Sequence, residues 1–504
     1  MSLKHNIAAN YASQLYVTLI GIVMVPTYVR YMGIEAYGLI GFFTMMQAWF
    51  NLLDLGLTPT MARETARFRG GATDALSLRR LLRALEGVFL GVALLGAVVM
   101  ISGAEAIAGK WLRVQDLPLV EVKHAIMLMA GIVSLRWVSG LYRGAIVGFE
   151  RQVWLSGFNS AIATVRFVLV VPFFIFVGTS PIHFFSFQLA VATIEVLTLV
   201  TQTYRVLPAI ERGSRIPWQW QPLRSVLKFS LSIAFSSSVW VLVTQTDKLL
   251  LSRLLPLADY AYFTLAVLVA GGVTLISGPV SLALQPRLTT LSAKGDDPGL
   301  IGVYRNATQL VGVIAVPAAL MLAFFSEQVL WAWTGDADIA RKAAPVLTLY
   351  ALGNGILAFG AFPYYMQFAK GDMRLHMQGN LLFLVMLVPA LVLATLNYGV
   401  VGAGYAWLCS NALLFLFWVP RVHNKFAKGL HGAWLIKDVI PIVLLTASGA
   451  LFAKWIVKWP EGRVAVAMAI LILGIGLLVM AAAGSSWIRE VINNRWRLQV
   501  SGQG

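Results

Sequence analysis

The sequence predicts an all-α polytopic membrane protein with about 14 transmembrane helices, arranged as two six-helix lobes plus two C-terminal helices. The lobes are expected to be related by a pseudo-two-fold axis along the membrane normal. Three observations lead to this fold class. The 504 residues are 59% hydrophobic and only 12% charged. The apolar runs are each roughly 20 residues long, and a segment near the N-terminus recurs weakly in the second half of the chain.

Each apolar run is long enough to cross the hydrocarbon core as a helix. An unpaired backbone amide in hydrocarbon costs several kcal/mol, so only helices or a closed barrel can span a membrane. Barrel strands would alternate polar and apolar residues, and these runs do not. The expected spans are residues 7–29, 36–57, 84–106, 122–147, 154–178, 182–206, 226–251, 260–284, 304–326, 343–367, 378–396, 400–420, 438–457 and 464–484.

The loops between the spans differ in their content of basic residues. With a cytoplasmic N-terminus, about two thirds of the 39 Lys and Arg residues fall on the inner side. The richest inner segments are 58–83, 205–228, 421–437 and the C-terminal tail. We therefore expect both termini to be cytoplasmic. The net charge of +17 then reflects topology and contact with anionic membrane lipids, and no nucleic-acid partner is needed to explain it.

The weak repeat predicts the domain organisation. The segment RYMGIEAYGLI (30–40) aligns with RLLPLADYAYF (253–263), and each lies at the outer connection between the first two spans of a six-span block. Parallel duplications of this kind are common in secondary transporters, whose substrate site lies between the halves. We expect an N-terminal lobe at 1–210, a C-terminal lobe at 211–425, and two additional helices with a basic tail at 426–504. That last pair falls outside the duplication.

Four charged residues lie deep within the predicted spans, where a charge costs about 2.5–3.5 kcal/mol on insertion scales and so needs a cavity or a partner. Arg136 and Arg143 are two helical turns apart and therefore share one helix face. We expect Arg136 to line an aqueous cavity, whereas Arg143 is close enough to the inner edge to reach out of the membrane. Arg166 and Glu195 lie at similar depth in the next two spans. An Arg166–Glu195 ion pair that only holds the lobe together is the alternative to a functional role.

Other polar residues sit at the ends of spans. Asp54 ends the second span, where it either serves a site or pairs with the arginine cluster of residues 63–69. Asp247 and Lys248 close the seventh span and point about 100° apart on a helix. Asn10 belongs to a neutral polar face of the first span, which is suited to contacting sugar hydroxyls or another helix.

The sign of the deep charges favours an anionic cargo. Arg136, Arg143 and Arg166 stand against a single acid, Glu195, so the set is cationic on balance. A low-dielectric cleft of that sign attracts anions, and the planar guanidinium fork matches phosphate. A cargo that bears pyrophosphate fits this pattern better than a cationic drug does. Glu195, Asp54 and Asp247 are candidate carriers of a coupling ion, H⁺ or Na⁺.

Several motifs resemble those of a known family. The stretch from Asn6 through VPTYVRYMGIEAYGLIGFFTMMQAWFNLLDLGLTPTMARETA resembles the start of Wzx-type polysaccharide-repeat flippases, in the multidrug/oligosaccharidyl-lipid/polysaccharide exporter superfamily. The shared features are an Asn-rich first span, Pro26, a G-x-x-x-Y-G turn at 33–38, and D-x-G-L at 54–57 followed by Arg63. Further similarity lies in LYRGAIVGFERQV (141–153), QTDKLLLSRLLP (245–256) and NYGVVGAGYAW (397–407).

This resemblance implies a V-shaped pair of lobes around a cationic cavity, in a flippase of the bacterial inner membrane. Such a protein moves an undecaprenyl-pyrophosphate-linked oligosaccharide outward by alternating access, coupled to an ion gradient. The residues that match charged cavity positions are Arg30, Asp54, Arg136, Arg166, Asp247 and Lys248. The extra C-terminal pair resembles that of lipid II flippase-like members, so a peptidoglycan precursor is an alternative cargo. A small-molecule or drug antiporter of the same superfamily is the other alternative.

The sequence argues against an enzyme, a metal centre or a cofactor. No predicted loop is long enough to fold into a catalytic domain at the membrane surface. The six histidines are spread along the chain, and the single Cys409 allows neither an internal disulfide nor a thiolate metal cluster.

Overall fold

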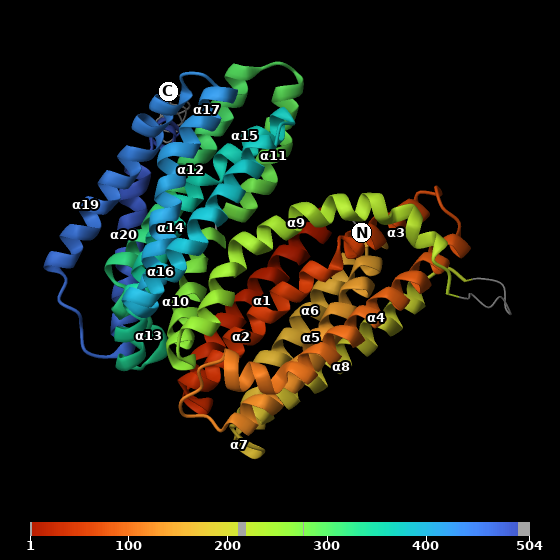
Figure 1. Ribbon diagram of the computed structural model, residues 1–504. Helices are drawn as coiled ribbons and strands as arrows, with labels where there is room; N and C mark the ends of the chain where they lie inside the picture. The colour runs from red at the N-terminus through yellow and green to blue at the C-terminus, as the bar shows by residue number, and fades with distance from the viewer. Residues whose placement is uncertain (1–2, 210–217, 276, 492–504) are drawn as a thin grey trace, which may run out of the picture. The chain divides into compact units, whose positions relative to one another are not determined.

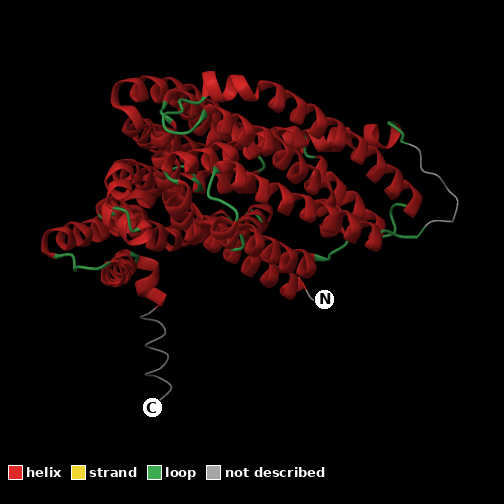
Figure 2. Cartoon of the chain, turned by 90° about the horizontal axis from the view of Figure 1, so that it is seen from below, coloured by secondary structure: helices red, strands yellow, loops and turns green. Residues whose placement is uncertain are grey.

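The computed structural model describes residues 3–209, 218–275 and 277–491, in which every regular element is a helix (Figures 1 and 2). The first helices are α1 (Leu3–Met32), α2 (Ile34–Phe50), η1 (Asn51–Asp54), α3 (Leu57–Arg69), α4 (Ala75–Ala106), η2 (Ile107–Trp111), α5 (Leu119–Gly148), α6 (Gln152–Phe167), α7 (Val170–Phe176) and α8 (Pro181–Val206). The inner-loop segment 210–217 and the tail from 492 lie outside the described residues.

The remaining helices follow that loop. They are α9 (Gln221–Leu254), α10 (Leu257–Leu275), α11 (Ser277–Ala293), α12 (Asp297–Phe324), α13 (Ser326–Thr334), α14 (Ala337–Gly360), α15 (Phe362–Lys370), α16 (Arg374–Leu413), η3 (Leu414–Trp418), α17 (Val419–Phe426), α18 (Leu430–Trp434), η4 (Leu435–Val439), α19 (Ile440–Ile456) and α20 (Arg463–Gly484).

The helices agree with the predicted spans. Within the described residues, 11 helical segments are long and apolar enough to cross a membrane. One of them, residues 374–426, contains two predicted spans, 378–396 and 400–420, which meet at Gly399 with a positive φ of 58°. That segment therefore counts as two spans. Helices α2 and α9, which correspond to the predicted spans 36–57 and 226–251, bring the number to the predicted fourteen. The prediction of an all-α polytopic membrane protein is therefore confirmed.

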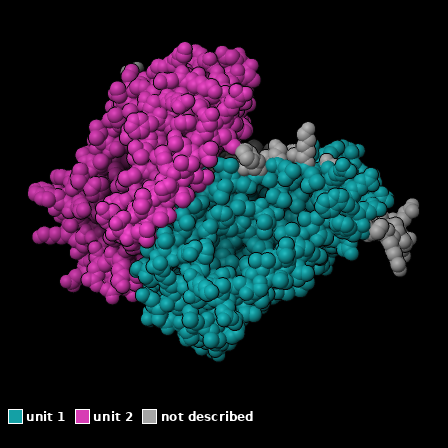
Figure 3. Space-filling view, viewed as in Figure 1, with its two compact units in different colours: residues 1–261 teal, residues 262–504 magenta. Residues whose placement is uncertain are grey.

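The chain forms two compact units, residues 1–261 (unit 1) and 262–504 (unit 2), coloured separately in Figure 3. In this division α9 belongs to unit 1. The units are defined by contacts, whereas the lobes predicted at 1–210 and 211–425 are defined by the duplication, and those lobe boundaries remain a prediction.

The order of helices repeats along the chain. Helix α2 begins at Ile34 and α10 at Leu257, which is the same spacing as that between the aligned segments 30–40 and 253–263. Helices α4 and α12 begin at positions 75 and 297, and helices α6 and α16 begin at positions 152 and 374. In both of these pairs, the separation of the two helix starts is one position shorter than that of α2 and α10. The repeat seen in the sequence between two short segments therefore extends through most of both six-span blocks.

Small residues let α5 approach α3 closely. Gly140, Gly144 and Gly148 recur at every fourth position and so form one stripe along α5. A Cβ atom on Gly144 would lie 2.5 Å from the carbonyl oxygen of Thr58, and one on Gly148 would collide with that of Ala62. This close packing fixes the rotation of α5 about its own axis.

We expect Gly144→Ala to destabilise the protein by about 1–3 kcal/mol, because the added methyl group has to push two backbones apart. The matched control is Gly91→Ala on α4, where a Cβ atom would meet nothing within 4 Å. That change should be neutral or stabilising by about 0.5–1 kcal/mol. Thermal unfolding of the purified variants in detergent measures both effects, and equal midpoints would refute the packing argument.

Two buried carboxylates tie unit 1 together at other points. Glu35, 4% exposed, accepts hydrogen bonds of 2.6–2.8 Å from three successive backbone amides, at residues 115–117 in the loop before α5. Glu86 on α4 accepts hydrogen bonds from the hydroxyls of Tyr142 (3.1 Å) on α5 and Tyr204 (2.8 Å) on α8. These contacts hold α5 and α8, which both contribute residues to the site described below.

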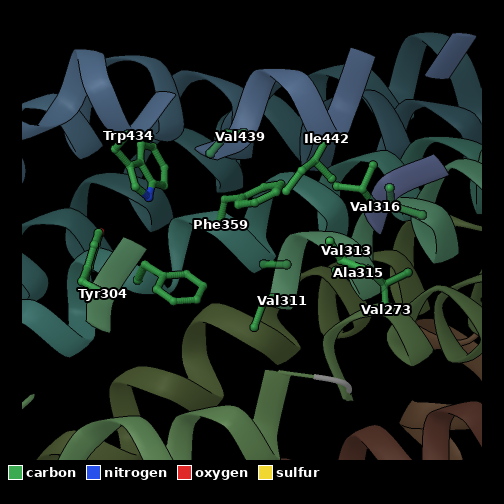
Figure 4. Packing of buried hydrophobic residues seen from close by; sticks show 14 of the residues in the cluster. Val273, Tyr304, Val311, Val313, Ala315, Val316, Phe359, Trp434, Val439 and Ile442 are labelled. Atoms are coloured by element: carbon green, nitrogen blue, oxygen red, sulfur yellow. The ribbon is translucent and has the colours of Figure 1, made fainter. Parts of the chain in front are cut away.

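Unit 2 has its own apolar core, part of which is shown in Figure 4. Valines and Ala315 of α12 pack against Phe359 of α14, while Trp434 of α18 and Ile442 of α19 close the cluster. Helices α19 and α20 pack on α12 and on each other. The two C-terminal helices are thus an integral layer of unit 2.

A polar network fixes that layer. Asp438 is fully buried and receives two hydrogen bonds from Arg305 on α12, at 2.6 and 3.0 Å, and one from Gln309 at 2.8 Å. The Gln309 side-chain oxygen in turn accepts hydrogen bonds from Ser485 (2.7 Å) and from the backbone amide of Trp487 (3.0 Å), beyond the end of α20. Two side chains of α12 therefore anchor both C-terminal helices.

Candidate functional site

A polar cavity of about 270 Å³ lies within unit 1, among helices α2, α5, α6 and α8, which Figure 1 labels. Apolar spans pack closely, so a cavity with four charged side chains in its wall is unusual for a helix bundle of this kind. The cavity is lined by Gln47, Phe50, Asn51, Val133, Arg136, Trp137, Arg143, Arg166 and Glu195.

Glu195 bridges two arginines from two different helices. Its Oε1 accepts a hydrogen bond of 2.5 Å from Arg143 on α5, and its Oε2 one of 2.7 Å from Arg166 on α6. The carboxylate side chain is 4% exposed, whereas the two arginine side chains are 28% and 21% exposed. Arg143 also donates a hydrogen bond to the side-chain oxygen of Asn159. The acid is therefore enclosed, and the guanidinium groups reach into the open space.

Arg136 is held differently. It donates hydrogen bonds to the side-chain oxygens of Gln47 (3.3 Å) and Gln188 (3.0 Å), and its guanidinium carbon lies 5.2 Å from the centre of the Phe43 ring. These two amide partners are neutral, unlike the carboxylate that faces Arg143 and Arg166. Three guanidinium groups against one carboxylate leave a surplus of two positive charges in the cavity wall.

Two donors in this cluster have no acceptor among the described residues. The Nε–H groups of Arg136 and Arg166 are both buried and unpaired there. A buried donor without an acceptor is costly, so a rearrangement that brings an acceptor oxygen to either group would be favourable. Phosphate oxygens are strong acceptors for guanidinium groups.

The structure brings together four of the nine residues named from the sequence. Arg136 and Arg143 share a face of α5, as their spacing predicts, and both line the cavity with Arg166 and Glu195. The Arg166–Glu195 ion pair considered as a structural alternative is present, but Arg143 joins it from a third helix. Arg143, which the sequence placed near the inner edge of its span, binds Glu195 and Asn159.

The other named residues do not line this cavity. Asn10 and Arg30 are exposed on α1. Asp247 is buried in α9, and its Oδ1 lies 3.7 Å from the Nζ of Lys248, which donates a hydrogen bond to the Thr244 carbonyl. Whether these residues contact a cargo stays a prediction.

Asp54 has a clear local role. Its carboxylate accepts hydrogen bonds from the backbone amide (3.2 Å) and the hydroxyl (2.6 Å) of Thr58, in the first turn of α3. Between them, Leu55 and Gly56 adopt left-handed φ values of 48° and 72°, which explains the glycine of the D-x-G-L motif. The acids that bind the 63–69 cluster are Glu64, with Arg63 and Arg67, and Glu150, with Arg69.

The neutral amides of the site were missed from the sequence. Gln47, Gln188 and Asn159 each accept a hydrogen bond from one of the cavity arginines. An amide side chain within an apolar span is the signal that could have identified them, because such groups need partners in hydrocarbon.

Two of the six histidines, His423 and His431, contact each other in the structure. The Nδ1 atoms of His423 and His431 are 3.1 Å apart, and the Nε2 atom of His423 lies 2.7 Å from the Tyr304 hydroxyl. Within the described ranges, no group of three or more His, Cys, Asp or Glu side chains is suited to hold a metal ion.

The charged cluster has no counterpart in the second repeat. The spacing of the α2–α10 pair and that of the α4–α12 pair differ by a single position, so each residue of the first repeat has two candidate equivalents in the second. For the four charged residues, all of these equivalents hold uncharged side chains. The equivalents are Ala358 and Phe359 for Arg136, Tyr365 and Met366 for Arg143, Val388 and Pro389 for Arg166, and Phe417 and Trp418 for Glu195. The repeat therefore builds its helices without ion pairs at these places, which means that the fold alone does not require them in unit 1.

Comparison with known proteins identifies a family and a relative of this chain. Residues 3–292, more than half of the chain, match the family model described as polysaccharide biosynthesis protein. The chain is 23% identical over 476 residues to the uncharacterized membrane protein EpsK of Bacillus subtilis (strain 168), covering 88% of this chain and 90% of that protein.

Solved structures show the same fold. Lipid II flippase MurJ in an inward closed conformation superposes with a TM-score of 0.71 at 13% identity, over 97% of this chain and 99% of that one. An inward-facing multidrug resistance MATE family transporter of the MOP superfamily gives 0.64 at 15% identity, over 82% and 96%. The chain is a member of the polysaccharide biosynthesis protein family, and it shares its fold with these two solved structures.

Proposed function

We propose that this transporter flips an undecaprenyl-pyrophosphate-linked oligosaccharide from the cytoplasmic to the periplasmic leaflet of the bacterial inner membrane. It does so by alternating access, coupled to a gradient of H⁺ or Na⁺, with both termini in the cytoplasm. The observation that carries the proposal is the surplus of two positive charges in the cavity of unit 1. A pyrophosphate that links a lipid to a sugar bears one negative charge on each phosphate, so its charge matches that surplus.

The ion cluster is better explained by function than by stability. Buried ion pairs are often no more stabilising than well-packed apolar residues of similar volume. The second repeat has apolar or uncharged residues at all the equivalent positions. Charges that the fold does not need, beside a cavity with unpaired donors, support the binding of an anion.

A peptidoglycan precursor is the second candidate cargo. The likeness to lipid II flippase MurJ extends over 97% of this chain, which supports that alternative, and the same arginines would serve a lipid carrier with a pyrophosphate. A cationic small molecule, as in a drug antiporter, fits poorly because the cavity is positive on balance.

The remaining predicted residues have places in this proposal. Of the acids named for ion coupling, Glu195 is in the cavity, whereas Asp54 binds Thr58 and Asp247 lies beside Lys248. Glu195 is therefore the first choice for the coupling ion. Asn10, Arg30 and Lys248 would contact the cargo outside this cavity.

The proposal is tested by whether the protein binds a lipid pyrophosphate in preference to a lipid monophosphate and a cationic dye. Purified protein in detergent is titrated in a calorimeter with geranylgeranyl pyrophosphate, geranylgeranyl monophosphate and the cationic dye rhodamine 6G. We expect the pyrophosphate to bind at least tenfold more tightly than the monophosphate, about 1.4 kcal/mol, and the dye not to compete. Equal binding of the two phosphates, or displacement by the dye, would contradict the proposal.

A surface variant serves as the control. Arg341 pairs with Asp338 on the surface of unit 2, where the side chains are 65% and 72% exposed. Arg341→Gln removes one positive charge from the protein without touching the cavity, so its binding constants should equal those of the wild type.

A further inference from the structure

Glu195 holds the two arginines in the manner of a bound anion. Each of its oxygens faces a different guanidinium group, at 2.5 Å from Arg143 and 2.7 Å from Arg166. The arginines come from α5 and α6, and the acid comes from α8. Two acceptor oxygens on one centre, shared between two guanidinium groups, is also the arrangement that a phosphate group adopts.

Among the described residues, Glu64 also pairs with two arginines, Arg63 and Arg67, but it does not line this cavity. Glu86 is bound by Tyr142, Tyr204 and Arg83, and Asp438 by Arg305 and Gln309. Neither acid lines the cavity of unit 1. The partners of Glu195 do line it, and their side chains remain 28% and 21% exposed, so another anion can approach them from the open side.

We propose that Glu195 is a built-in competitor, which occupies the anion position between Arg143 and Arg166 until a phosphate of the cargo displaces it. This inference rests on the proposed function, because it concerns the same arginines. An empty site with three guanidinium groups and no acid would suffer strong mutual repulsion and would bind any anion of the cell. A tethered carboxylate reduces both the repulsion and the binding of other anions. Only a multiply charged ligand then binds the arginines strongly enough to displace it.

The cavity also offers the displaced acid a new partner. A buried carboxylate left without a cation would be costly. Arg136 lines the same cavity, and it donates hydrogen bonds to the neutral side-chain oxygens of Gln47 and Gln188. The carboxylate can turn to Arg136 when the cargo takes Arg143 and Arg166, so it need not remain unpaired.

The test compares the affinity of Glu195→Gln with that of the wild type, with geranylgeranyl pyrophosphate and inorganic pyrophosphate as probes. Because the glutamine side chain is uncharged and competes only weakly for the arginines, the variant should bind both probes at least tenfold more tightly. Glu64→Gln is the matched control, since it removes another buried acid that pairs with two arginines but lies outside the cavity. Its affinities should be unchanged.

The outcomes separate this inference from the proposed function. Unchanged or weaker binding by Glu195→Gln would overturn the competitor role. If Glu195 only positioned the arginines, its removal would weaken the binding of the probes. No binding of either probe by the wild type and the variant alike would instead refute the proposed function. Should Glu195→Gln fail to fold, Glu195→Asp replaces it: the shorter acid bridges the arginines less well, so tighter binding supports the inference and unchanged or weaker binding refutes it.

Discussion

The triple variant Arg143→Gln/Arg166→Gln/Glu195→Gln is expected to fold but to lose at least 99% of cargo translocation. Two charged hydrogen-bonding partners of the cargo disappear, each worth about 1.5–3 kcal/mol, and every 1.4 kcal/mol is about a factor of ten in binding. Removing both sides of the ion pairs leaves no unpaired charge between them, so the effect on stability should be small. The uncharged equivalents in the second repeat support this expectation.

Translocation is measured as surface polysaccharide in a host that lacks its own flippase, and folding as the thermal unfolding midpoint in detergent. The control is the double variant Arg341→Gln/Asp338→Asn, which removes an exposed ion pair from unit 2 and should behave as the wild type. Normal polysaccharide from the triple variant would exclude the cluster from the transport path.

Asp438→Asn is expected to destabilise unit 2 by about 2–4 kcal/mol. Asp438 is fully buried and pairs with Arg305 through two hydrogen bonds. Breaking a buried pair by changing one partner typically costs about 3–5 kcal/mol, and the partial exposure of Arg305, 31%, reduces that figure. The same change weakens the hold of Gln309, and so loosens both C-terminal helices.

A lower thermal unfolding midpoint than that of Asp338→Asn, an acid exposed on the same unit, is the expected readout. If the two variants unfold at the same temperature, the Asp438 network is not what anchors α19 and α20.

Hydropathy was sufficient to find the spans, because the membrane imposes one requirement on every helix. It also separated the spans 378–396 and 400–420, and the backbone leaves helical geometry between them, at Gly399. The repeat was visible from two short segments, 30–40 and 253–263, and the helix starts extend it through both blocks.

The site was only partly predictable for a different reason. The depth of Arg136, Arg166 and Glu195 follows from counting residues along each span, but the pairing of Glu195 with Arg143 depends on how α5 and α8 pack. That packing is set by contacts such as Glu86 with Tyr142 and Tyr204, which join residues up to 118 positions apart in the chain. No local pattern encodes such contacts.

Asp54 shows the opposite case. Its position at the end of a span suggested a charged functional group, yet its hydrogen bonds to Thr58 are local, and the D-x-G-L-T sequence contains all the residues involved. A capping role could have been inferred from the sequence, since Asp is among the preferred residues before a helix.

The proposed function requires that the guanidinium groups of unit 1 bind the pyrophosphate of a lipid-linked cargo. Cryo-electron microscopy of the protein with geranylgeranyl pyrophosphate tests it most directly. We expect phosphate density in the cavity, within hydrogen-bonding distance of Arg143 and Arg166. Density at another place, with the bridge from Arg143 through Glu195 to Arg166 unchanged, would contradict it.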